Sequence, residues 1–342
     1  ANAAFAVVNS QDSGTGAVNA KLQDSLTVQT VITGAVTASS VDSSGNMQEA
    51  LASSNKAANS LALSATTLNS NGAILNNQES DAPVTSTIGV TGADAGVVIA
   101  TAAIDSSGIA LTDNLVRSSA TGNVATNTQN IAATTLTLNA PDATPASTIT
   151  GLAGTVNGAF STLSVQWTSN DVQATTSAGF NVSADDVTNG SSINNDRNAM
   201  TAQAQGAVAA NTTILAVGGT LSQASAATTA VANAAVIANI QELANGAAVS
   251  ATVDTTTTQA VLTSITGVVS SSSVSTSDNR VQASADGASA SNALTASATT
   301  LTTPAGPVAT PGSTGQTANA AFAVVNSQDS GTGAVNAKLQ DS

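Results

Sequence analysis

ANAAFAVVNSQDSGTGAVNAKLQDS is the sequence of residues 1–25, and residues 318–342 repeat it without a change. The two copies begin 317 residues apart. Self-similarity at a fixed distance is typical of repeat proteins. The chain therefore reads as one full period, residues 1–317, followed by the start of the next period, residues 318–342. This arrangement indicates an extended structural protein rather than a self-contained enzyme.

A weaker repeat divides the period into four diverged units, with motif cores near residues 32–68, 101–136, 185–221 and 265–301. In each core an Asn follows a branched apolar residue by five positions, and a second Asn follows thirteen residues later. The four pairs are Asn46 and Asn59, Asn114 and Asn127, Asn198 and Asn211, and Asn279 and Asn292. Repeats of this size are typical of solenoids, propellers and domain arrays.

Alternation favours strands within these units. Val281, Ala283 and Ala285 alternate with polar residues, and after Gly287 the alternation resumes one position later. A period of two is the pattern of a β-strand, and a Gly that shifts the phase indicates a bulge or corner. The opposing interpretation is helical, because Ala is the best helix former. It is strongest for residues 222–247, which we consider as a possible local helix.

The combined pattern predicts an all-β fold, a right-handed or left-handed β-solenoid (β-helix) built from tandem repeats. Successive turns would stack about 4.8 Å apart. A turn of roughly 20 residues would give some 16 turns and on the order of 75 Å per period. All six Pro lie in stretches of variable length between the units, which we expect to be loops or irregular coils. These stretches are residues 69–95, 139–175, 222–258 and 302–317.

Composition limits the functions that the chain can have. Six Lys and Arg stand against twenty Asp and Glu, for a net charge of −14, which argues against nucleic acid as a partner. Without Cys, the chain has no disulfides and no thiolate metal site. The chain has no run of 18 apolar residues, so we expect no membrane-spanning helix. The Ala-rich start lacks the charged segment of a signal peptide, so we expect any secretion signal outside this sequence.

Catalytic chemistry has few candidates. The chain has no His and no Cys, so the commonest general base and the thiol nucleophile are missing. Asp185 and Asp186 would point to opposite faces of a strand, which favours an acidic turn over an acid/base pair. Oxygen-rich turns make Asp12, Asp42 and Asp142 weak calcium candidates, although no EF-hand loop accompanies them. We therefore expect no enzyme activity and no cofactor other than calcium.

The eight paired Asn are the main structural candidates. Stacked Asn inside a solenoid can form amide ladders, in which each side chain donates to the next turn. The alternative is that these residues occupy left-handed corners on the surface. Phe160, Trp167 and Phe180 also stand out in a chain with 1% aromatic residues. They could form a small satellite core under a loop or an exposed contact patch.

The units at residues 46–68, 114–136 and 279–301 resemble the repeats of long surface adhesins and holdfast-attachment proteins of Gram-negative bacteria. This resemblance implies secretion and a β-rich rod at the bacterial cell surface. The expected role is a structural repeat of an extracellular fibre or stalk in adhesion or biofilm matrix. Expected partners are adjacent copies end to end, laterally bundled fibres, and polysaccharide or another surface. The alternatives are a helical filament subunit of flagellin type and a secreted polysaccharide-acting β-helix protein.

Overall fold

The computed structural model describes residues 3–22, 27–89, 95–138, 146, 149, 152, 154, 156–223, 233–255, 259–302, 308–309 and 318–340. Every regular element within these ranges is a β-strand, and none is a helix. The strands of six sheets pair in parallel, each strand with its equivalents far away in sequence. One short antiparallel pair, β25 (Val308–Ala309) with β26 (Ala318–Asn319), lies outside these sheets. The expected all-β fold is therefore confirmed.

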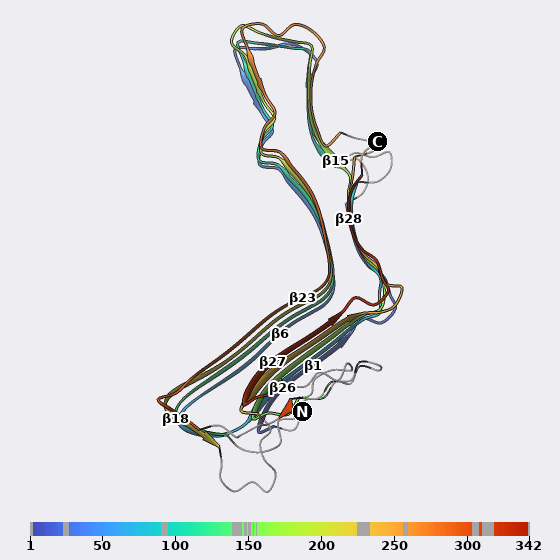
Figure 1. Ribbon diagram of the computed structural model, residues 1–342. Helices are drawn as coiled ribbons and strands as arrows, with labels where there is room; N and C mark the ends of the chain where they lie inside the picture. Colours follow the sequence, from blue (N-terminus) through green and yellow to red (C-terminus); the bar gives the residue numbers. More distant parts are fainter. Residues whose placement is uncertain are drawn as a thin grey trace.

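The chain passes repeatedly through the six sheets in the same order, and we call one such pass a circuit. Figure 1 shows the circuits as traces that follow one common path side by side. The first circuit contains β1 (Phe5–Asp12), β2 (Val18–Leu22), β3 (Val28–Ile32), β4 (Val36–Thr37), β5 (Ser40–Asp42) and β6 (Met47–Ser70). The second contains β7 (Gly72–Ser80), β8 (Val84–Ile88), β9 (Ala95–Thr101), β10 (Ala103–Asp105), β11 (Gly108–Ala110) and β12 (Leu115–Leu138).

The later circuits repeat this order of strands. The third contains β13 (Phe160–Thr168), β14 (Val172–Thr176), β15 (Ala178–Ala184), β16 (Asp186–Thr188), β17 (Ser192–Asn194) and β18 (Ala199–Gln223). The fourth contains β19 (Ala235–Leu243), β20 (Val249–Asp254), β21 (Val261–Ile265), β22 (Ser273–Ser275), β23 (Arg280–Ser297) and β24 (Thr300–Leu301). A fifth circuit begins with β27 (Phe322–Asp329) and β28 (Val335–Gln340). The strand orders β1-β7-β13-β19-β27 and β2-β8-β14-β20-β28 place this fifth circuit on the fourth.

One circuit is much longer than the 20 residues expected from the sequence. Phe5 pairs with Gly72, Gly72 with Phe160, Phe160 with Ala235, and Ala235 with Phe322. The steps are therefore 67, 88, 75 and 87 residues long. Four circuits make up one period, so the expected 16 turns and 75 Å are wrong. At one strand spacing per circuit, a period advances about 19 Å.

Two further expectations from the sequence are wrong. The stretches expected to be loops contain β7, β8, β13, β14, β19 and β20. The possible helix at residues 222–247 contains β19, a strand, in its described part. Nearly every residue of β7, β13 and β19 is buried. Parallel strands that are covered on both faces lose the alternation of apolar and polar residues by which strands are recognised.

The four long strands β6, β12, β18 and β23 do alternate, and all four change phase in their first half at one shared position along the stack. In β12 the buried residues before Gly122 are Val116, Ser118 and Ala120, and those after it include Asn123 and Ala125. The buried positions therefore change from even to odd numbers at this Gly. Gly206 and Gly287 occupy the equivalent positions in β18 and β23. A Cβ on Gly206 would lie too close to the carbonyl oxygen of Gly287, so the backbones approach closely at this bend.

The interior consists of apolar clusters separated by polar side chains. The largest cluster lies where the first half of each long strand faces β8, β9, β14, β15 and β20, and it includes Phe180. A second, at the far end of the long strands, includes Phe160. The third covers the outer face of β7, β13 and β19 and contacts Trp167. The three aromatic residues thus lie in different clusters, and the expected single satellite core is wrong.

Left-handed corners recur at two positions in each circuit. The position before the first Asn of each unit has positive φ in all four circuits. Its occupants are Gly45, Asp113, Arg197 and Asp278, with φ between 55° and 69°. The four Asn that follow do not have positive φ in this structure. The left-handed corner therefore lies one residue before each Asn, so the alternative that these four Asn occupy the corner is wrong.

Candidate functional site

The first Asn of each unit forms a column along the stack, directly after the left-handed corner. Oδ1 of Asn114 accepts hydrogen bonds from the backbone N–H and from Nδ2 of Asn46, both at 2.9 Å. Asn198 accepts the same two bonds from Asn114, at 3.1 and 2.8 Å. Asn279 accepts them from Asn198, at 2.9 and 3.1 Å. Each side chain thus fixes the turn of the circuit before it.

The second Asn of each unit forms a column inside the body. Nδ2 of Asn59 donates to Oδ1 of Asn127 at 2.8 Å, Asn127 donates to Asn211 at 2.7 Å, and Asn211 donates to Asn292 at 2.7 Å. Asn127 and Asn211 are buried, with exposed fractions of 0% and 1%. Buried amides need partners, because an unpaired one costs about 1–3 kcal/mol. Stacking the same residue in every circuit supplies those partners.

A column of five Gln, which sequence reasoning missed, faces the long strands three residues before this second Asn column. Nε2 of each Gln donates to Oε1 of the Gln one circuit earlier, at 2.8 Å in all four steps. The column consists of Gln11, Gln78, Gln166, Gln241 and Gln328. Three of these Nε2 atoms also donate to carbonyl oxygens of the opposite long strands, Val124, Val208 and Ser289. The Gln column therefore joins the two facing sheets as well as the circuits.

A signal for the Gln column was present in the sequence. Asn9-Ser-Gln-Asp12, Asn76-Asn-Gln-Glu79 and Asn239-Ile-Gln-Glu242 share an Asn two residues before the Gln and an acidic residue after it. The spacings between these fragments vary, and they lie partly in stretches that the sequence pattern assigned to loops. Their alignment becomes visible only when β1, β7, β13, β19 and β27 are paired.

One column is interrupted. Asn9, Asn76, Asn239 and Asn326 share a position along the stack, but Ser164 takes this position in β13. Nδ2 of Asn76, Oγ of Ser164 and Oδ1 of Asn239 are all buried without a hydrogen-bond partner. One circuit further, Nδ2 of Asn239 donates to Oδ1 of Asn326 at 2.9 Å. The shorter Ser side chain thus leaves an unused donor on one side and an unused acceptor on the other.

The structure builds no cluster of metal ligands around Asp12 or Asp42, the two calcium candidates that it describes. Asp12 accepts a hydrogen bond from the backbone N–H of Gly14 at 2.7 Å, and Asp42 is exposed. Asp142 lies outside the described residues. Asp185 accepts from Oγ1 of Thr266 and Asp186 from the backbone N–H of Val268, so both hold the next circuit. Within the described ranges, no group of three or more acidic residues has a geometry suited to a metal ion.

Carboxylates also stack beside the Gln column. Asp12 pairs with Glu79, and Glu242 pairs with Asp329, with Trp167 in the circuit between the two pairs. Burial raises the pKa of Glu79, and the charges of Asp81 and Asp12 raise it further. Burial raises the pKa of Glu242 too, and Asp329 adds to this effect. In these columns the Asp disfavours the charged form of the neighbouring Glu. In the amide columns, by contrast, neighbouring side chains bond to one another.

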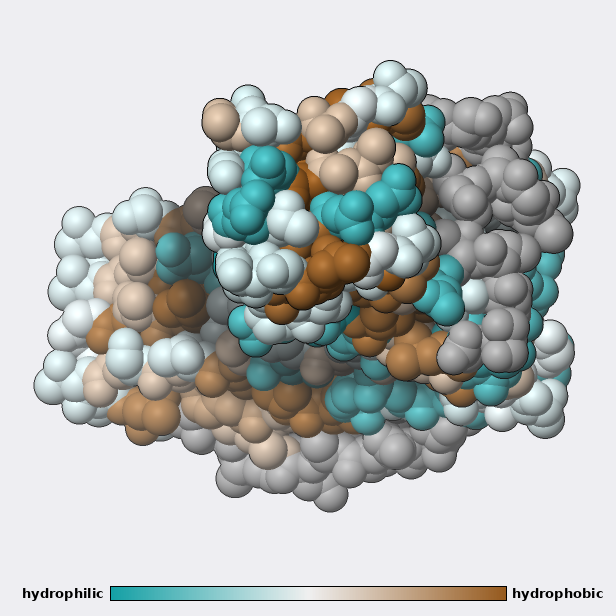
Figure 2. Space-filling model, turned by 90° about the horizontal axis from the view of Figure 1, so that it is seen from above, coloured by the Kyte–Doolittle hydropathy of each residue, from teal (hydrophilic) through white to brown (hydrophobic). Residues whose placement is uncertain are grey.

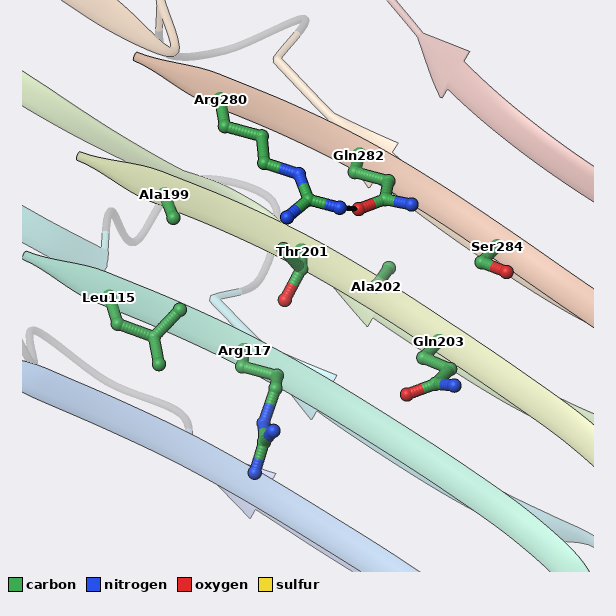
Figure 3. Close-up of a pocket in the computed structure, with 9 residues that line it drawn as sticks. All are labelled: Leu115, Arg117, Ala199, Thr201, Ala202, Gln203, Arg280, Gln282 and Ser284. Atoms are coloured by element: carbon green, nitrogen blue, oxygen red, sulfur yellow. Dashed lines mark hydrogen bonds between the residues drawn. The ribbon is translucent and has the colours of Figure 1, made fainter. Parts of the chain in front are cut away.

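A hollow of about 400 Å³ lies on the outer face of the long strands (Figure 3). Arg117 and Arg280, two of the six cationic residues of the chain, line it together with Thr201. Figure 3 shows Arg117 extending from β12 toward β6, where its Nη2 lies 2.6 Å from Oε1 of Glu49. Arg280 donates to Oε1 of Gln282 on its own strand. Glu49 and Arg280 thus lie on the first and the last long strand of the stack.

The two ends of the stack are open edges. Val274 is 42% exposed, whereas Ile109 and Ile193 at the equivalent position are 1% and 0% exposed. Leu301 is 51% exposed, against 0% for its equivalents Leu136 and Leu221. Figure 2 shows hydrophobic and hydrophilic residues intermingled over the face in view. The open edges are therefore where inward-facing apolar side chains reach the surface.

Comparisons with protein-family models, curated protein sequences and solved structures gave no match. No described segment forms a helix of the length and hydrophobicity needed to cross a membrane. The function must therefore be argued from the columns and the edges themselves.

Proposed function

We propose that the chain is a β-solenoid repeat and that it serves as a structural unit of an extracellular fibre or stalk. The observation that carries the proposal is the position of β27. Residues 322–329, identical in sequence to residues 5–12, lie in the same sheet as β1, four strands further on. The start of a new period therefore stacks on the end of the old one. A longer array would continue in the same direction, with one period after another.

The interior supports a structural role. Among its buried polar side chains are columns of Asn and Gln that bond to their equivalents in the neighbouring circuit. Such columns fix the register between circuits, because a shifted strand would bury unpaired amides. Stability along a stack is approximately a sum of terms between neighbours. Each added circuit therefore brings its own stabilising contacts, as a fibre requires.

We place this fibre at the bacterial cell surface, in adhesion or biofilm matrix, without catalytic activity. Charged residues make up only 8% of the chain, and Cys is absent. Both features support this location, together with the resemblance to repetitive surface adhesins. A flagellin-type subunit would need a largely helical fold, which the described residues do not have. No observation favours the polysaccharide-acting alternative. Lateral bundling and contact with polysaccharide remain part of the proposal.

Electron microscopy of proteins with one, two and four periods tests the fibre. We expect particles whose dimension along the stack increases by about 19 Å for each added period, while the outline of a circuit stays the same. Circular dichroism should show a strand spectrum for all three proteins. Compact particles of constant length, or a strong helical signal, would contradict the proposal. The adhesive role is tested by displaying four periods on cells that do not attach to surfaces and counting the attached cells. A composition-matched scrambled sequence is the control.

A further inference from the structure

The open edges of the stack are chemically complementary. Oδ1 of Asn46, at the first edge, accepts no hydrogen bond within the described part of the chain. The backbone N–H of Asn279, at the last edge, lacks the Asn acceptor that the same N–H has in the three earlier circuits. Nδ2 of Asn292 likewise has no acceptor among the described residues. In the two Asn columns, acceptors therefore face the first edge and donors face the last edge.

The register of the missing contact follows from the sequence. Asn279 and Asn292 lie 84 residues before the equivalents of Asn46 and Asn59 in a following period. A step of 84 residues already separates Asn114 from Asn198 in the structure. The Gln241–Gln328 bond shows one junction contact directly, because Gln328 is the equivalent of Gln11. The rest of the following circuit, equivalent to β3 through β6, would cover β21 through β24.

We infer that β23 receives the β6 of the following unit head to tail, with Glu49 of that unit between Arg280 and its own Arg117. This inference rests on the proposed function, because it supposes that units follow one another along the stack. In this register Gln282 lies directly opposite Glu49, and Arg280 lies two residues earlier on the same face. This is a diagonal that Arg and Glu side chains span.

The charges give the junction a direction. Arg280 meets an acidic residue only when the last edge of one unit meets the first edge of another. Two first edges would meet without an Arg280, and two last edges would meet without a Glu49, so neither arrangement contains this ion pair. The amide columns and the charges therefore select the same head-to-tail arrangement, and the partner is a second copy of this repeat.

Engineered disulfides test the register, since the chain has no Cys of its own. The protein is residues 1–317 followed by residues 1–342, with Ser291→Cys in the first period and Ala58→Cys in the second. Both side chains are exposed, and they share one column. Strands one spacing apart meet the geometry of a disulfide. In the matched control, Ala62→Cys replaces Ala58→Cys and lies about 13 Å further along the strand.

We expect the Ala58 variant to form the disulfide at least about tenfold faster than the Ala62 variant, because it is held opposite its partner. Equal rates, or no disulfide in either variant, would overturn the head-to-tail register. A stack that grows in height with each period, without this disulfide, would overturn the junction and leave the proposed function standing. Compact particles would instead count against the proposed function.

Charge reversal tests the contact of Arg280 with Glu49 in the same protein. Arg280→Glu in the first period should slow formation of the 291–58 disulfide several-fold, whereas Arg280→Lys should retain the rate. An unchanged rate with Arg280→Glu would overturn the ion pair. Circular dichroism of each variant checks that the strands have formed.

Discussion

Phe5 and Phe322 are the same residue of two successive periods, and they lie in the two outermost strands of one five-stranded sheet. Gly72, Phe160 and Ala235 occupy the same position in the three strands between them. The exact sequence repeat is thus also a spatial repeat, along the direction in which the circuits stack. This relationship makes stability along the stack the property to test first.

Ser164→Asn should stabilise the protein. The new side chain could accept from Nδ2 of Asn76 and donate to Oδ1 of Asn239, two buried atoms that have no partner. Two hydrogen bonds of this kind are worth about 1–2 kcal/mol in the free energy of unfolding. Urea denaturation of the wild type and the variant measures the change. Ser164→Leu is the control, because it fills a similar volume without the amide. If Leu stabilises as much as Asn, filling of space accounts for the gain.

Asn127→Ala should destabilise the protein by about 2–4 kcal/mol, because it removes two hydrogen bonds and leaves the buried Oδ1 of Asn211 unpaired, while Nδ2 of Asn59 keeps only its bond to Asn76. Asn292→Ala should cost less, since Asn292 lies at the open edge and has one such bond. Ser119→Ala, on the outer face of the same strand as Asn127, is the control. Thermal unfolding followed by circular dichroism ranks the three variants. Equal melting temperatures for Asn127→Ala and Ser119→Ala would contradict a role for the Asn column.

Gly206→Ala should destabilise the bend of the long strands. The added Cβ would meet the carbonyl oxygen of Gly287 and Cγ2 of Val249, so adjacent circuits would have to move apart. Overpacking of this kind costs about 1–3 kcal/mol. Gly218→Ala is the control, because nothing lies within 4 Å of its added Cβ and its φ is not positive. A melting temperature lowered equally by both substitutions would show that close approach at the bend is not the cause.

Mild acid should stabilise the protein through Glu79 and Glu242. Both have a folded-state pKa above the ordinary value of 4.5, so the folded chain binds these protons more tightly than the unfolded chain. Their contribution to stability therefore increases as the pH falls through the folded-state pKa values, and it levels off below the unfolded value. Urea midpoints measured from pH 7 down to about 4.5 follow this change.

The double variant Glu79→Gln, Glu242→Gln should be more stable than the wild type at pH 7 and should show a weaker dependence on pH. Asp42→Asn is the control, because Asp42 is exposed and shares its column with Ala110 and Asn194 rather than with an acid. If the double variant keeps the full pH dependence, other carboxylates are responsible for it.

Sequence reasoning recovered the parts of the fold that repeat with regular spacing. The Asn of the long strands were recognisable because a constant thirteen residues separate each pair, and Gly287 because the alternation changes phase there. Residues of β7, β13 and β19 escaped, because strands buried on both faces carry no alternation. The Gln column lies in those strands, so it escaped with them. The circuit length was wrong because one unit was taken to contain several turns, whereas each unit is a single turn.

The length of a circuit has a mechanical consequence. A circuit contains 67–88 residues but contributes only one strand spacing to the height of the stack. Peeling one circuit from an end would shorten the stack by about 4.8 Å and release on the order of 270 Å of extended chain. Under tension, such an array would unfold one circuit at a time, and each circuit could pair again with the stack when the load is removed. If the proposed surface fibre is correct, it would absorb sudden force by lengthening.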